Sequence, residues 1–96
     1  MNRREHLITI AAEECAELAQ ELSKANRFGM KDGYPGKVET NAERIRSEFN
    51  DLVATLHLLE DETGEILTML LESDMRSKQR RVEEFLVYSK TVGTLQ

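Results

Sequence analysis

The feature that most constrains the fold is one loop set between two long helical patterns. The only proline, Pro35, and three of the five glycines fall in the stretch GMKDGYPGKVET, residues 29–40. Proline and clustered glycine interrupt regular structure, and this stretch is about as long as loops in compact domains usually become. We therefore predict a loop here with regular structure on both sides. The loop is either a functional lid or a plain connector.

On both sides of this loop, apolar residues recur at the spacing of an α-helix. The pattern predicts one helix over residues 4–28. It predicts a second that Thr40 caps and that runs to about Glu62, stopping near Gly64. Glu43 would complete a capping box by reaching back to the backbone N–H of Thr40. The apolar positions are Leu7, Ile10, Ala11, Leu18, Leu22, Ala25 and Phe28 in the first helix, and Ile45, Phe49, Leu52, Val53, Leu56 and Leu59 in the second.

The remaining third of the chain also reads as helical. Residues 65–72 are predicted to form one or two helical turns, and a last helix is expected from about Ser73 to Lys90. Its inward positions would be Met75, Val82, Phe85 and Leu86. No strand pattern competes, so the predicted fold class is all-α. With 96 residues the chain makes a single domain, 1–96, short enough that a partner subunit would add stability.

Composition excludes several classes of function. A net charge of −5, with three Phe, two Tyr and no Trp, argues against a general nucleic-acid binder, so no nucleic-acid partner is expected. No apolar run approaches the roughly 18 residues of a membrane span, so no membrane partner is expected either. The single cysteine and the absence of a signal-peptide pattern at the N-terminus predict a cytoplasmic protein.

Several carboxylates fall where apolar side chains are expected. On a helical wheel, Glu14 and Glu21 lie inside the apolar stripe of the first helix, and Glu17 lies at its edge. In the second helix Glu48 lies at the edge of the stripe, with Asp51 one step further out. Burying unpaired carboxylates is costly, and few basic residues occupy matching inward positions. A hard divalent cation such as Mg²⁺ would neutralise them. On spacing alone, the alternative that these are solvated surface charges stays open.

The acids and their neighbours resemble a known family. EECAEL (residues 13–18) and SEFNDL (47–52) are similar to the Glu-x-x-Glu … Glu-x-x-Asp signature of MazG-like proteins, which belong to the all-α nucleoside triphosphate pyrophosphohydrolases. The flanking segments ELSKANRFG, TNAERIRSEFNDL and RRVEEFLVYSKTVG resemble the small, phage-type members. The resemblance extends over most of the chain, except for roughly residues 60–74.

The resemblance implies a fold, a cofactor and a reaction. It implies a helical bundle completed by dimerisation, as a homodimer or a dimer of dimers, and a hydrolase that uses Mg²⁺, with Mn²⁺ as a possible substitute. The reaction would split a nucleoside triphosphate into nucleoside monophosphate and pyrophosphate. Matched onto this chain, the metal ligands are Glu14, Glu17, Glu48 and Asp51. Glu14 and Glu17 are the candidate catalytic residues, with Glu17 the candidate general base.

Substrate contacts are expected from residues near the signature. Lys24 and Arg27 match the family's segment and would hold the outer phosphates. Asn41 would bind ribose or base, or it simply belongs to the start of the second helix. In the last helix the candidates are Lys78, Arg81 and the nearby Tyr88, although that basic run also fits a solvated face.

Two points stay open from the sequence. Glu21 lies outside the signature, so only a supporting or electrostatic role is expected for it. The alternative function is a non-catalytic helical dimerisation or interaction module that uses its acidic cluster structurally. Mg²⁺ would not be expected to stabilise such a module.

Overall fold

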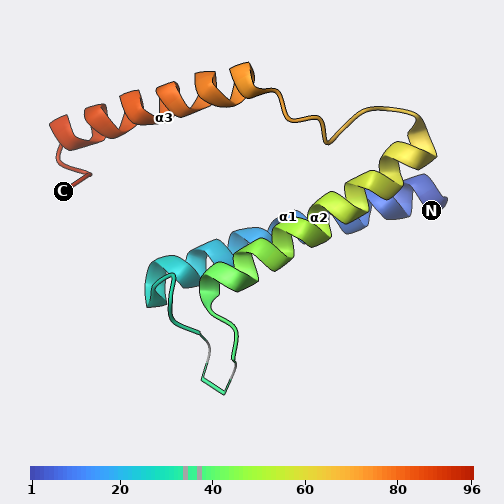
Figure 1. Ribbon diagram of the computed structural model, residues 1–96, viewed down its shortest axis with the longest axis horizontal. Coiled ribbons are helices and arrows are strands. Elements are labelled where there is room, and N and C mark those ends of the chain that lie inside the picture. The colour runs from blue at the N-terminus through green and yellow to red at the C-terminus, as the bar shows by residue number, and fades with distance from the viewer. Residues whose placement is uncertain (34, 37) are drawn as a thin grey trace.

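The chain folds into three helices, in a computed structural model that describes residues 1–33, 35–36 and 38–96 (Figure 1). They are α1 (Arg3–Phe28), α2 (Asn41–Thr63) and α3 (Glu72–Thr91). The described residues contain no strand, so the all-α prediction is confirmed. Tyr34 and Lys37 belong to the predicted loop and lie outside the described residues. Over the described ranges, no helix combines the length and hydropathy needed to cross a bilayer.

Side-chain caps fix where α1 and α2 begin. The Asn2 side chain accepts a hydrogen bond from the Glu5 N–H (2.8 Å), and the Glu5 carboxylate accepts one from the Asn2 N–H (3.0 Å). This capping box was not predicted. Thr40 caps α2 as predicted, accepting from the Glu43 N–H at 3.1 Å. The predicted return bond to the Thr40 backbone is wrong, because the Glu43 carboxylate accepts instead from the Thr40 hydroxyl, at 3.1 Å.

Helices α1 and α2 form an antiparallel hairpin (Figure 1). The two open ends are joined by Arg3 of α1 and Glu62 of α2, whose charged groups lie 3.0 Å apart. Among the described residues, four apolar side chains are buried between the helices: Leu7, Ala11, Ala25 and Leu59. They lie on the predicted stripes. Such a small core contributes limited hydrophobic stabilisation, since that contribution scales with the apolar area removed from water.

The segment between α2 and α3 is not helical, so the prediction for residues 65–72 is wrong for all but the last of them. Gly64 ends α2 in the left-handed conformation, at φ +77°. The Glu60 carboxylate then accepts hydrogen bonds from the backbone N–H groups of Leu67 (2.7 Å) and Thr68 (3.0 Å). These backbone donors are satisfied without a helix, and one or two isolated turns would gain too few bonds to be stable.

Helix α3 begins and ends within about one residue of its predicted bounds but lies apart from the hairpin (Figure 1). In the described part of the chain it contacts neither α1 nor α2. Met75, Val82, Phe85 and Leu86 are exposed, so the prediction that they face inward is wrong within one chain. The radius of gyration is 16.9 Å, against about 12.5 Å for a compact chain of this length.

Candidate metal centre

Three carboxylates from the two hairpin helices converge at one place. Helix α1 supplies Glu14 and Glu17, whose spacing of three residues puts both on the side that faces α2, and α2 supplies Glu48. Each offers one carboxylate oxygen, and these oxygens lie within 4.8 Å of one another. We call Glu14, Glu17 and Glu48 the acid cluster. The family resemblance predicted all three as metal ligands, together with Asp51.

The acid cluster carries charge that the described protein groups do not balance. Two of its oxygens, Glu14 Oε2 and Glu48 Oε2, are buried and accept no hydrogen bond from the described residues. Burial, followed by the negative charges of Glu17 and Asp51, raises the pKa of Glu14. Burial and the neighbouring Glu17 carboxyl raise the pKa of Glu48 to about 6. The charged form of these carboxylates is therefore unfavourable unless a cation binds beside them.

Asp51, the fourth predicted ligand, lies beside the cluster but outside it. Its side chain is exposed, and none of its oxygens falls within the group that the other three form. Its charge nevertheless contributes to the raised pKa values of both Glu14 and Glu48. The structure therefore brings three of the predicted ligands together and places the fourth within electrostatic reach.

The donor set fits a hard divalent cation. All the candidate ligand atoms are carboxylate oxygens, which Mg²⁺ and Ca²⁺ prefer. Oxygens on opposite sides of one Mg²⁺ are about 4.2 Å apart, and across Ca²⁺ about 5 Å. A spread of up to 4.8 Å means that Mg²⁺ would draw the side chains together by about half an ångström. The buried, unpartnered oxygens of Glu14 and Glu48 are the atoms that a cation would satisfy.

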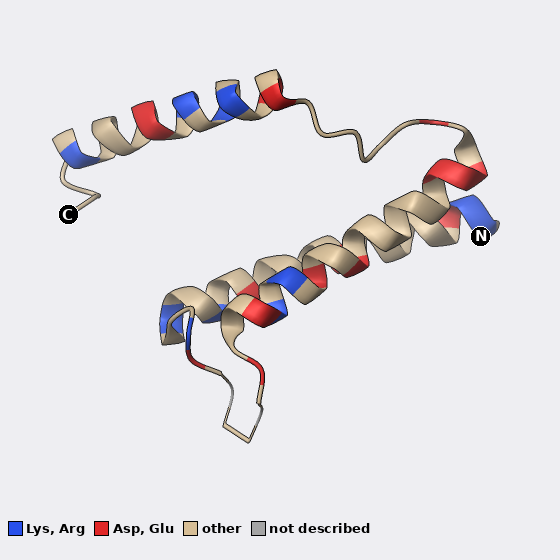
Figure 2. Cartoon of the chain, in the orientation of Figure 1, with Lys and Arg blue, Asp and Glu red and all other residues tan. Residues whose placement is uncertain are grey.

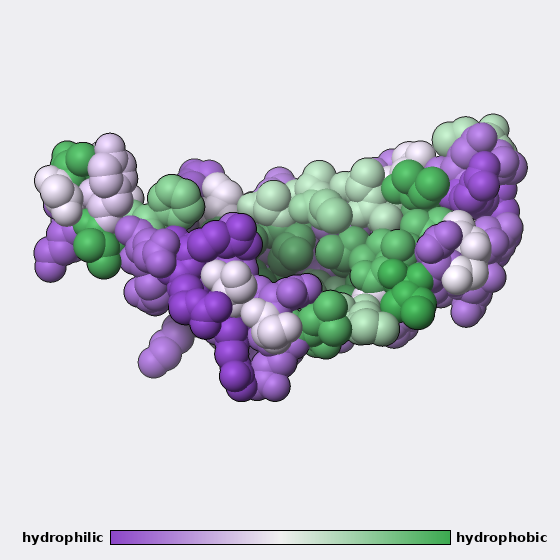
Figure 3. All heavy atoms as spheres, turned by 90° about the horizontal axis from the view of Figure 1, so that it is seen from above, coloured by the Kyte–Doolittle hydropathy of each residue, from purple (hydrophilic) through white to green (hydrophobic). Residues whose placement is uncertain are grey.

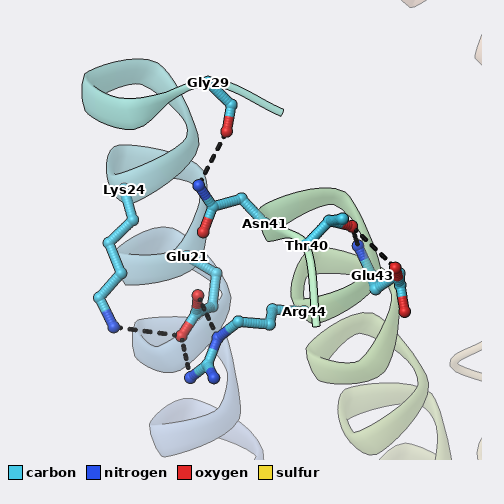
Figure 4. A network of polar contacts seen from close by, with 7 residues as sticks. All are labelled: Glu21, Lys24, Gly29, Thr40, Asn41, Glu43 and Arg44. Atoms are coloured by element: carbon cyan, nitrogen blue, oxygen red, sulfur yellow. Dashed lines mark hydrogen bonds and ion pairs between the residues drawn. The ribbon is translucent and has the colours of Figure 1, made fainter. Parts of the chain in front are cut away.

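One helical turn nearer the loop, Glu21 is neutralised by basic residues (Figure 4). Its side chain is buried and accepts two hydrogen bonds of 3.0 Å from the Arg44 guanidinium. The Lys24 ammonium lies 3.5 Å from the same carboxylate. The hydrogen bond from Arg44 is the main reason that the pKa of Glu21 is lowered. The supporting role expected for Glu21 is therefore an ion pair across the hairpin.

Sequence reasoning missed Arg44 as the partner of Glu21. The signal was present in the spacing: Arg44 precedes Glu48 by four residues, and Glu21 follows Glu17 by four. In an antiparallel hairpin, one turn forward on the first helix lies opposite one turn back on the second. Once Glu17 and Glu48 are placed together, Glu21 and Arg44 must also meet. Figure 2 shows acidic and basic residues close together along this part of the hairpin.

Beyond this ion pair, a cavity of about 760 Å³ opens between the end of α1, the loop and the start of α2. We call it the loop-end pocket. The Asn41 side chain is buried and donates a hydrogen bond of 2.8 Å to the Gly29 carbonyl, so it fastens α2 to the end of α1. The lining of the loop-end pocket includes three of the predicted substrate residues, Lys24, Arg27 and Asn41. Phe28, Pro35 and Arg44 line it as well.

The remaining predicted substrate residues are not brought to this site within one chain. Lys78, Arg81 and Tyr88 are exposed on α3, which makes no contact with the hairpin in the part of the chain that the structure describes. Charges of both signs run along α3 (Figure 2).

No family model matches the chain, and no curated protein or solved structure shows significant similarity to it. The resemblance to MazG-like enzymes rests on the sequence motifs alone.

Proposed function

We propose that this protein hydrolyses nucleoside or deoxynucleoside triphosphates to the monophosphate and pyrophosphate with the help of Mg²⁺. The observation that carries the proposal is the convergence of Glu14, Glu17 and Glu48, with two buried oxygens that lack a partner among the described residues. These are residues that the MazG-like signature picks out. The site has the chemistry of a cation site, and the pocket beside it has the size of a ligand site.

Different residues of the site would have different roles in the reaction. Glu14, Glu17 and Glu48 would hold the ion, with Asp51 close enough to join them. Bound there, Mg²⁺ would offset phosphate charge and lower the pKa of a bound water. In the hydrolysis, the water oxygen bonds to the α-phosphorus while the bond to the bridging oxygen breaks and pyrophosphate leaves. Glu17, the exposed member of the cluster, would accept the proton of the attacking water on the carboxylate oxygen that does not bind the ion.

We also propose that the active form is a homodimer or a dimer of dimers. Helix α3 presents an apolar stripe, made of Met75, Val82, Phe85 and Leu86, that has no partner in the described part of the chain. The radius of gyration of 16.9 Å also exceeds that of a compact chain. Hydrophobic residues gather around a hollow on the face seen in Figure 3. A second copy would cover this surface and supply the core that a single chain lacks.

A non-catalytic interaction module is the second candidate, favoured by the same uncovered stripe on α3. It would keep the dimer and leave the acid cluster without a chemical role. The two candidates differ in one requirement, since only the hydrolase needs a metal ion and a nucleotide.

The test is pyrophosphate release from a panel of common NTPs and dNTPs, with Mg²⁺ and with EDTA. The double variant that carries both Glu48→Gln and Asp51→Asn is assayed in the same way, and its folding is checked by circular dichroism. The proposal expects Mg²⁺-dependent release from at least one nucleotide and a loss of at least about 100-fold in the folded variant, because the ion's share of the charge stabilisation is removed. Release that is unaffected by EDTA and by the variant would contradict it. Absence of release from every nucleotide would favour the interaction module.

A further inference from the structure

The loop-end pocket begins a short distance from the acid cluster. Arg44, on its wall, is one helical turn from Glu48, and Lys24 is about two turns from Glu17, which puts the pocket about 6–10 Å from the cluster along the helices. Its volume of about 760 Å³ falls in the range of pockets that bury a drug-sized ligand, roughly 300–1,000 Å³. A phosphate group alone would leave most of this space empty.

The described pocket wall carries three cations, Lys24, Arg27 and Arg44, and two of them are balanced within the protein. Arg44 and Lys24 both pair with Glu21, at 3.0 and 3.5 Å. Asp32 adds a carboxylate to the lining itself. An outer phosphate that bound Arg44 or Lys24 would have to compete with Glu21 for them. It would also lie near the carboxylate of Asp32. A ligand group without charge meets neither cost.

The wall also offers a flat aromatic surface. Phe28 lines the pocket with 54% of its surface exposed. The guanidinium of Arg27 lies over the Phe28 ring, 4.9 Å from its centroid. Aromatic rings and guanidinium planes are the surfaces on which nucleic-acid bases stack.

A fixed hydrogen-bond acceptor completes the lining. The Asn41 side chain is only 3% exposed, and its amide nitrogen is committed to the Gly29 carbonyl. Its amide oxygen points away from Gly29 (Figure 4) and accepts no hydrogen bond among the described residues. Such an acceptor suits an N–H group at the edge of a base.

We propose that the loop-end pocket binds the base and sugar of the nucleotide, with Phe28 as the stacking surface, while the phosphates lie at the acid cluster. This inference rests on the proposed function. It gives the pocket a different ligand group from the outer phosphates that the sequence assigned to Lys24 and Arg27. It also makes Phe28, which the sequence did not single out for function, a residue that determines nucleotide affinity.

The test compares a nucleotide with its phosphate chain alone. Titration calorimetry with Mg²⁺ would measure the binding of α,β-methylene deoxynucleoside triphosphates carrying each of the four bases, and of inorganic tripolyphosphate. The proteins are the wild type, Phe28→Ala and the control Met30→Ala. Met30 is equally exposed, at 54%, and does not line the pocket. Both substitutions are at exposed positions, so neither should disturb folding.

The expected result is that Phe28→Ala weakens binding of the best nucleotide analogue roughly 5- to 150-fold, the value of one stacked base. Binding of tripolyphosphate should change less than about twofold, and Met30→Ala should change neither. Equal weakening of both ligands would overturn the proposal, because the pocket would then hold phosphate. So would an unchanged affinity for the analogue, which would leave the proposed hydrolase intact. A wild type that binds no analogue with Mg²⁺ would overturn both proposals.

Discussion

Glu21 of α1 and Arg44 of α2 join the two helices of the hairpin by two hydrogen bonds of 3.0 Å. Each lies one helical turn from a member of the acid cluster, Glu21 from Glu17 and Arg44 from Glu48. Because helices are rigid over one turn, this ion pair sets the register in which Glu48 lies opposite Glu14 and Glu17. The ion pair thus affects the candidate metal centre by positioning its carboxylates.

Replacing Glu21 with Gln should therefore affect both stability and the metal centre. The substitution leaves the Arg44 guanidinium without its charged partner in a mostly buried setting. We expect the melting temperature to fall by roughly 5–15 °C. Mg²⁺-dependent stabilisation should weaken as well. Thermal unfolding followed by circular dichroism, with and without Mg²⁺, measures both effects.

The matched control for this variant is Glu62→Gln, which breaks the exposed pair with Arg3. Exposed pairs contribute little, so the melting temperature should change by less than about 5 °C, and the Mg²⁺ effect should be unaltered. Equal losses in the two variants would show that the Glu21–Arg44 pair has no special role in the register.

The pKa shifts predict that the metal-free protein loses stability between about pH 4.5 and pH 6. Glu48 has its pKa raised from 4.5 to about 6 in the folded state, and the pKa of Glu14 is also raised. The folded chain therefore binds more protons than the unfolded chain in this window, and stability falls as pH rises through it. Glu21 has the opposite sign: its lowered pKa gives stability above about 4.5 that is lost on acidification.

Melting temperatures measured in EDTA should accordingly be higher near pH 5 than at pH 7.5. Adding Mg²⁺ should stabilise the protein more at pH 7.5 than at pH 5, because protons compete with the ion for the same carboxylates. A melting temperature that rises steadily from pH 5 to pH 7.5 in EDTA would refute this account of the acid cluster.

Much of the fold could be predicted from the sequence because local signals decide it. The helix-breaking residues at 29–40, the Thr40 cap and Gly64 mark the limits of the hairpin, and each acts within a few residues of the chain. The conformation of residues 65–71 depends instead on the Glu60 carboxylate, up to eight residues away, which binds the N–H groups of Leu67 and Thr68. Helical periodicity carries no trace of such a contact.

The candidate site was partly predictable for the same reason. Acids that fall on an apolar stripe indicate an internal polar site, and Glu14, Glu17 and Glu48 do meet. The separation of Asp51 from this group and the pairing of Arg44 with Glu21 depend on how the two helices are set against one another. Side-chain periodicity assigns a face to each residue, but it does not fix which turn of one helix lies beside which turn of the other.

Glu48→Gln should stabilise the metal-free protein and abolish its response to metal. At pH 7.5 the substitution removes one of the repelling charges, so the melting temperature in EDTA should rise by a few degrees. Adding Mg²⁺ should raise it further in the wild type but not in the variant. Glu13→Gln is the control, since Glu13 is exposed on α1 and outside the acid cluster. A destabilised Glu48→Gln that still responds to Mg²⁺ would contradict the proposed ligand role.

The uncovered stripe of α3 predicts the oligomeric state. Sedimentation should give a mass of two or four chains of 11.0 kDa. The double variant Val82→Asp, Leu86→Asp should dissociate to single chains, because it places charges in the centre of the proposed interface. Val87→Asp, about 120° round α3 from the midpoint of Val82 and Leu86, should leave the assembly intact. A wild type that sediments as a single chain at about 100 μM would count against the proposed dimer, since standard-size interfaces commonly hold well below that concentration.

Metal binding by the acid cluster is tested most directly by a calorimetric titration of the protein with Mg²⁺ and Mn²⁺ at pH 7.5, without nucleotide. Three proteins are compared. They are the wild type, the double variant that carries both Glu14→Gln and Glu48→Gln, and the control Glu13→Gln. The acid cluster predicts saturable binding in the wild type and the control, and its loss in the double variant. If the double variant binds the ions as well as the wild type does, the ions lie elsewhere. The cluster would then be no more than a group of surface charges.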